Sequence, residues 1–146
     1  MNSIAIGDVK NFMSDLLVGS EFDDFLVKEV SVTIYNTFII DGHINKDFFS
    51  DDDYTALEEK EFSIWKDIKP TCFELIKGKR TPVKFRIVFM KRPDYNESVD
   101  GLFLNVKYEN GNLNCVTATS IKTFTMDKTI ESEWDSEIEK RLAKYC

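Results

Sequence analysis

The sequence has little of what marks metal sites, disulfide frameworks and membrane spans. Its three cysteines are widely spaced with no C-x-x-C pair, and histidine occurs once, so neither a zinc site nor a disulfide framework is predicted. No apolar run approaches the roughly 20 residues that cross a bilayer. The N-terminus has no basic region followed by a long apolar stretch, so no secretory signal is indicated. These absences predict a cytoplasmic protein with reduced thiols, no membrane contact and no metal.

Glycine is also scarce, with six residues, and the Gly78-Lys79 pair lacks the preceding glycine of a phosphate-binding loop. A nucleotide-cradling enzyme is therefore disfavoured, and no cofactor is predicted. What the chain does have is a globular composition, with 42% hydrophobic and 13% aromatic residues. At 146 residues it is long enough to bury its own core, so residues 1–146 are expected to form one domain.

Charge is unevenly distributed along the chain. The formal net charge is −7, but residues 1–61 hold 4 basic and 14 acidic side chains, whereas residues 62–128 hold 12 basic and 7 acidic ones. The excess of positive charge is concentrated between Lys66 and Arg92, with nine basic and two acidic residues. Such asymmetry bears on partners more than the overall sign does.

The first third of the chain reads as a strand, a helix and further strands. Ile4 and Ile6 alternate as in a short strand, Asp8 offers an N-cap oxygen, and the apolar residues that follow share one helical face. Gly19 is expected to end this helix in the left-handed conformation. Residues 25–44 are β-branched and aromatic and predict two or three strands.

The opening pattern then returns 59 positions later, where SIWKDIKPTCFELIKG (63–78) matches IAIGDVKNFMSDLLVG (4–19). Asp67 takes the place of Asp8 as a cap, Pro70 falls near the start of the helix, and Gly78 takes the place of Gly19. Strands are expected over 83–90, 102–109 and 112–123, with a tight turn at Asn110-Gly111. This predicts an internal repeat, 1–49 and 62–126, joined by the polar connector 50–61, in which Ser50 or Asp51 caps a short helix. Chance is the alternative, because capped amphipathic helices ending in glycine resemble one another.

The last element predicted is an amphipathic helix over 127–145. Asp127 is its expected N-cap, acidic residues come early and basic residues late, as the helix dipole favours. Its apolar stripe either packs on the sheet or binds a partner. The stripe consists of Ile130, Trp134, Ile138, Leu142 and Tyr145.

No catalytic residue is assigned. His43 lies in an Asp41-Gly42-His43 turn, and no nucleophile motif such as G-x-S-x-G accompanies it, so a hydrogen-bonded turn residue is expected. The run Asp51–Asp53 lacks the glycine and the glutamate of a calcium loop and is read as a helix start. Carboxylates are abundant, but their spacing selects no catalytic pair.

The remaining signal is the basic stretch IKGKRTPVKFR at 76–86. Because side chains alternate along a strand, the two cations that follow the loop are expected on the face opposite the apolar residues. Either this stretch solubilises an acidic protein or it forms an anion-binding patch. The candidate binding residues are Lys77, Lys79, Arg80, Lys84 and Arg86.

Two resemblances add to this reading. The strings LLVG, TFIIDGHI, FELIKGKRTP, LFLNVKYENG and TSIKTFT resemble a family of uncharacterised clostridial proteins, a domain of unknown function, over nearly the whole chain. The doubled strand–helix–strands order is similar to the single domain of DNA sliding clamps. That resemblance implies a fold rather than a function, because clamps join several such domains, and here Lys10 is flanked by Asp8 and Asp15.

The fold prediction is therefore α+β: two strand–helix–strands repeats forming a mainly antiparallel sheet, plus the C-terminal helix. The function is expected to be that of a small non-catalytic interaction module whose basic second half meets an anionic partner, either a nucleic acid or a protein. An enzyme that acts on a small substrate through carboxylates near His43 is the alternative, and assembly into a homo-oligomer is a third.

Overall fold

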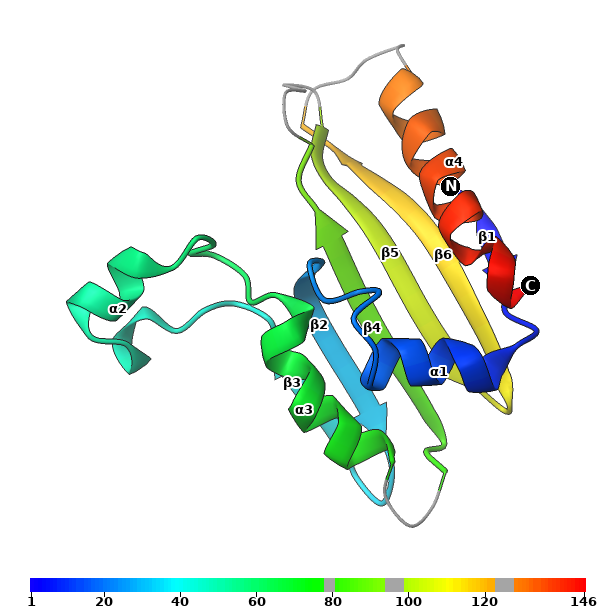
Figure 1. Ribbon diagram of the computed structural model, residues 1–146, viewed down its shortest axis with the longest axis horizontal. Helices are drawn as coiled ribbons and strands as arrows, with labels where there is room; N and C mark the ends of the chain where they lie inside the picture. The colour runs from blue at the N-terminus through cyan, green and yellow to red at the C-terminus, as the bar shows by residue number, and fades with distance from the viewer. Residues whose placement is uncertain (78–80, 94–98, 123–127) are drawn as a thin grey trace.

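The fold consists of two layers, one antiparallel sheet and a set of helices that cover one of its faces (Figure 1). The computed structural model describes residues 1–77, 81–93, 99–122 and 128–146. Within these ranges the predicted α+β class, the mainly antiparallel sheet and the helix near the C-terminus are confirmed.

All the strands described belong to one six-stranded sheet, in which each strand runs antiparallel to its neighbours. Their order across the sheet is β1-β6-β5-β4-β2-β3, so β2 and β4 lie at the junction between the first and second halves of the chain. The strands are β1 (Ser3–Ala5), β2 (Leu26–Thr33), β3 (Thr37–Asp41), β4 (Lys84–Lys91), β5 (Val99–Glu109) and β6 (Asn112–Ile121).

Three helices, α1, α3 and α4, lie over the same face of the sheet, while α2 lies apart from it (Figure 1). The helices are α1 (Val9–Leu17), α2 (Asp51–Ala56), α3 (Trp65–Ile76) and α4 (Thr129–Leu142), with 3-10 turns η1 (Lys46–Phe48) and η2 (Ala143–Tyr145). The stripe predicted for the C-terminal helix packs on the sheet, with Trp134, Ile138, Leu142 and Tyr145 buried. Asp127, its predicted cap, lies outside the described residues.

Helix α1 begins as predicted but ends differently. The Asp8 carboxylate accepts the backbone N–H of Asn11 at 3.2 Å, which confirms the N-cap. The prediction that Gly19 ends the helix in a left-handed conformation is wrong, because its φ is not positive and Val18 caps the helix in the right-handed region. Space explains the glycine instead, since a Cβ at this position would lie 3.1 Å from the Asp15 carbonyl oxygen.

Helix α3 begins two residues before Asp67, so the prediction that Asp67 caps it is wrong. The loop at 23–25 supplies the acceptors instead: Trp65 N donates to the Phe25 carbonyl at 2.8 Å and Lys66 N donates to the Asp23 carbonyl at 3.2 Å. A side-chain cap is unnecessary when the first amides are satisfied in this way. The earlier start also places Pro70 inside the helix rather than near its start. Gly78, its predicted end, lies outside the described residues.

The turn and strand predictions hold with small differences. Asn110 and Gly111 have φ of 54° and 80° and connect β5 to β6, as the Asn-Gly pair predicts. Residues 25–44 form two strands. Phe62 and Ile64, just before α3, form isolated bridges with His43 and Leu26, respectively.

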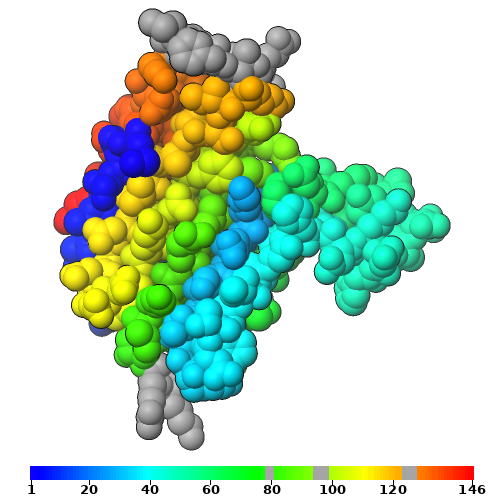
Figure 2. Space-filling model, turned by 180° about the vertical axis from the view of Figure 1, so that it is seen from behind, coloured from blue at the N-terminus to red at the C-terminus, as the bar shows by residue number. Residues whose placement is uncertain are grey.

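The face of the sheet opposite the helices is open, and strands form most of the surface in Figure 2. Residues 45–61, which include the predicted connector 50–61 and the five residues before it, project from the body beside this face and are called the arm (Figures 1 and 2). Ser50 caps α2 as predicted, accepting the Asp53 N–H at 3.1 Å, yet neither η1 nor α2 has a buried residue. None of the helices in the described part of the chain has the length and apolarity that a bilayer crossing requires.

Candidate functional site: the open sheet face and a neighbouring groove

The basic residues of β4 lie on the open face of the sheet. Lys84 and Arg86 are exposed and alternate with buried Phe85 and Ile87, which point into the helix-covered core. Of the five predicted binding residues, these two are brought together by the strand. Lys77 is the C-cap of α3, in the other layer, and Lys79 and Arg80 lie outside the described residues.

A third cation joins them from β5, and the sequence analysis missed it. Arg86 and Lys107 are directly opposite one another in the antiparallel ladder, and Lys84 is opposite Glu109. Arg86 has one acidic neighbour, Glu29 of β2, with 3.6 Å between guanidinium nitrogen and carboxylate oxygen. The Asn110-Gly111 turn fixes which β5 side chains share a face, but the pairing of β5 with β4 is not visible in the sequence.

These residues surround a shallow hollow of about 370 Å³ on the open face. Within the described residues, neither Lys84 nor Lys107 has a carboxylate within ion-pair distance, although Glu109 lies directly opposite Lys84. We call Lys84, Arg86 and Lys107 the cationic face. The hollow is lined by Glu29, Ser31, Lys84, Phe85, Arg86, Lys107, Tyr108 and Glu109.

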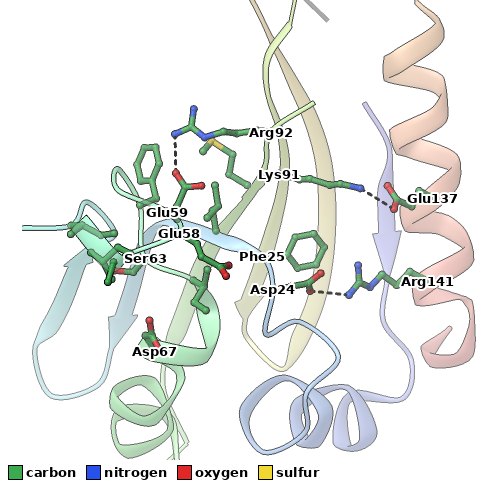
Figure 3. A pocket seen from close by; sticks show the side chains of 17 residues that line it. Asp24, Phe25, Glu58, Glu59, Ser63, Asp67, Lys91, Arg92, Glu137 and Arg141 are labelled. Atoms are coloured by element: carbon green, nitrogen blue, oxygen red, sulfur yellow. Dashed lines mark hydrogen bonds and ion pairs between the residues drawn. The ribbon is translucent and has the colours of Figure 1, made fainter. Parts of the chain in front are cut away.

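A second, larger concavity of about 640 Å³ lies between the base of the arm, the start of α3 and α4 (Figure 3). Apolar residues such as Phe25 line it. Its cations are largely paired with acids from other elements. Lys91 contacts Glu137 at 3.4 Å, Arg141 contacts Asp24 at 3.7 Å, and Arg92 contacts Glu61 at 3.2 Å and Glu59 at 3.7 Å.

This second concavity, which we call the groove, therefore differs from the cationic face in its electrostatics. Five acids and three cations line it, and the ion pairs connect elements that are distant in the sequence. Such pairs at a partly exposed rim add little affinity or stability individually. No described group of His, Cys, Asp or Glu side chains in the chain is arranged to hold a metal ion.

His43 is a hydrogen-bonded turn residue, as expected. Its Nδ1 lies 2.6 Å from Asp41 Oδ1, its backbone N–H donates to the same oxygen at 3.0 Å, and its ring centroid lies 4.5 Å from that of Phe62. Both hydrogen bonds stabilise the carboxylate and hold the pKa of Asp41 below its usual value, with the backbone bond contributing most. In the described part of the chain, no hydroxyl or thiol group is hydrogen-bonded to the imidazole, so the pair forms no triad.

Together these features define a small α+β domain with one covered and one open sheet face, and three cations gather on the open face. The chain belongs to a family of unknown function, DUF5721, whose model matches residues 15–146. This confirms the resemblance to an uncharacterised family. No curated protein and no solved structure matches the chain, so the resemblance to sliding clamps stays a prediction.

Proposed function

We propose that this protein is a non-catalytic interaction module whose open sheet face binds an anionic partner through Lys84, Arg86 and Lys107. The observation that carries the proposal is the placement of Arg86 directly opposite Lys107 on paired strands. Side chains at opposite positions have Cβ atoms about 4.5–5.5 Å apart, and like charges there are destabilising. A cation pair of this kind costs stability until an anion lies between its members.

The surroundings of the pair support binding of an extended anionic group rather than a single buried ion. Glu29 offsets part of the charge of Arg86 from one side, while Lys107 has no such neighbour among the described residues. The hollow is open to solvent, so contacts there are expected to be screened by salt. Phosphate and carboxylate groups both suit a guanidinium beside an ammonium.

The domain organisation proposed from the sequence, two related halves, is supported by strand pairing. The first strand after α1 (β2) pairs with the first strand after α3 (β4). The strand before α1 (β1) pairs with the last strand of the second half (β6), and the segment before α3 bridges to His43 at the end of the first half. This exchange is what a duplicated unit would produce. A cytoplasmic location is supported by three free thiols, those of Cys72, Cys115 and Cys146.

Fluorescence anisotropy tests the proposed binding. A labelled DNA duplex and a labelled poly-glutamate peptide are titrated with the wild-type chain and with the triple variant K84E/R86E/K107E at low salt. Loss of three favourable contacts is expected to weaken binding of at least one probe by roughly tenfold or more. Adding K77E, K79E and R80E then tests the rest of the patch predicted from the sequence.

The matched control is K10E/K66E/K140E, which reverses three exposed lysines of the helical layer and changes the net charge equally. Circular dichroism melts verify that both variants fold. Equal binding by wild type and the K84E/R86E/K107E variant, or equal loss in the control, would contradict the proposal, because the effect would then be absent or due to net charge alone.

A further inference from the structure

The arm carries a concentrated negative charge, most of which has no ion-pair partner among the described residues. Its two lysines are engaged locally, with Lys46 and Lys60 Nζ 5.2 and 5.7 Å from the centroid of the Tyr54 ring. Lys60 also donates to the carbonyls of Thr55 and Leu57, at the end of α2. Within the described residues, no ion pair reaches the remaining acids, Asp47, Asp51, Asp52, Asp53 and Glu58.

The arm also exposes aromatic surface. The Phe48 side chain is 85% exposed and packs edge-on against Phe49, at 5.3 Å between ring centroids. An exposed aromatic ring on a projecting segment offers apolar surface that a partner could cover. At its base the arm is fixed to the body by Arg92, which pairs with Glu59 and Glu61.

The arm and the cationic face lie at opposite ends of the same strands. The arm leaves the body beside Leu26, which bridges to Ile64 and pairs with Met90, whereas Lys84 pairs with Thr33 at the other end of β2. Seven residue steps of strand, about 23 Å, separate these two ends. Because the arm also points away from the sheet (Figure 2), it does not contact the cationic face of its own molecule.

We propose that the anionic partner of the cationic face is the acidic arm of a second copy of this chain. The inference rests on the proposed function and names its partner from charge complementarity: the arm supplies Asp51, Asp52 and Asp53, and the face supplies Lys84, Arg86 and Lys107. The contact joins two different surfaces, so copies associate head to tail, into a ring if the rotation closes and into an open chain if it does not.

Sedimentation velocity on the full chain, over a range of protein concentrations, tests the association. The wild type is expected to sediment as species larger than the monomer at low salt and as a monomer at about 0.5 M salt, where exposed charges are screened. The face-reversed variant K84E/R86E/K107E and the arm-reversed variant D51K/D52K/D53K are each expected to remain monomeric at low salt. The control K10E/K66E/K140E is expected to associate like the wild type.

Mixing the two reversed variants is the decisive step. Each then offers a surface complementary to the other, so equal amounts of both are expected to associate although neither does so alone. A wild type that stays monomeric at every concentration, or an association that survives reversal of the face, would overturn the inference.

A charge-neutralised variant, D51N/D52N/D53N, separates this inference from the proposed function, because it keeps the cationic face, removes the acids that self-association needs and adds no new cation. Binding of labelled poly-glutamate or DNA by this variant, together with a monomeric wild type, would leave the proposed function standing and overturn self-association. Failure of this variant to bind either probe would count against the proposed function itself.

Discussion

The indole Nε1 of Trp65 donates a hydrogen bond to the backbone carbonyl oxygen of Leu16 at 2.8 Å, and both side chains are fully buried. Leu16 lies in the last turn of α1, where carbonyls have no partner within the helix. The bond therefore satisfies the end of α1 with a residue from the start of α3. It connects the two halves of the chain through a contact 49 positions apart in sequence.

Replacing Trp65 with Phe removes this donor and leaves a buried carbonyl unsatisfied. The free energy of unfolding is expected to fall by about 1–3 kcal/mol, which urea denaturation followed by far-UV circular dichroism would measure. Tyr35→Phe serves as the control, because its ring is 83% exposed and the change should alter stability by less than about 0.5 kcal/mol. Equal stabilities for W65F and the wild type would mean that the indole bond contributes nothing.

Two N-caps in this chain should respond differently to the same substitution. Asp8→Ala removes the cap of α1, whose buried face belongs to the core, and should lower the free energy of unfolding by about 0.5–2 kcal/mol. Ser50→Ala removes the cap of α2, which has no buried residue, and should leave the global unfolding midpoint unchanged. A lowered midpoint for S50A would show that the arm contributes to the core.

Local features of the fold could be predicted from the sequence, and long-range ones could not. The Asp8 cap and the Asn110-Gly111 turn are set by interactions within a few residues, so their patterns are sufficient. The start of α3 was misplaced because its first amides are satisfied by the distant loop at 23–25.

The candidate site follows the same rule. Alternation in β4 placed Lys84 and Arg86 on one face, but Lys107 was missed because no local signal specifies which β5 residue lies opposite Arg86. The prediction for the end of α1 was wrong for a related reason. The indole of Trp65, a distant residue, hydrogen-bonds the Leu16 carbonyl in the last turn, and Gly19 does not adopt the left-handed conformation.

Lys107→Glu should separate stability from binding. A glutamate opposite Arg86 replaces repulsion by attraction, so the free energy of unfolding is expected to rise by about 0.2–1 kcal/mol. Binding of an anionic probe should weaken in the same variant. A residue that serves only solubility would not show both changes. Thermal melts and anisotropy titrations on one preparation would measure them, and unchanged affinity for the probe would contradict the account.

The three thiols should differ in reactivity and link stability to pH. Burial raises the pKa of Cys72 and Cys115 to about 12, from an ordinary 9.0, while Cys146 is exposed. At pH 8 about one buried thiol in ten thousand is ionised, so iodoacetamide should label Cys146 alone until urea is added.

Because the folded-state pKa of each buried thiol lies above its unfolded value, these groups stabilise the fold fully below pH 9. That contribution is lost as the pH rises from 9 to 12. C72A/C115A should therefore lose stability less steeply over this range than the wild type, in urea titrations at each pH. An equally steep loss of stability in C72A/C115A and in the wild type would contradict the raised pKa of the two buried thiols.

The central claim is that the open sheet face binds an anionic partner, and amide chemical-shift mapping tests it most directly. Poly-glutamate is titrated into the ¹⁵N-labelled D51N/D52N/D53N variant at low salt, and the shifts are assigned to residues. The account predicts that they concentrate at Ser31, Lys84–Arg86 and Lys107–Glu109 around the hollow. Shifts confined to the exposed surfaces of α1, α3 and α4, or no shifts at all, would contradict it.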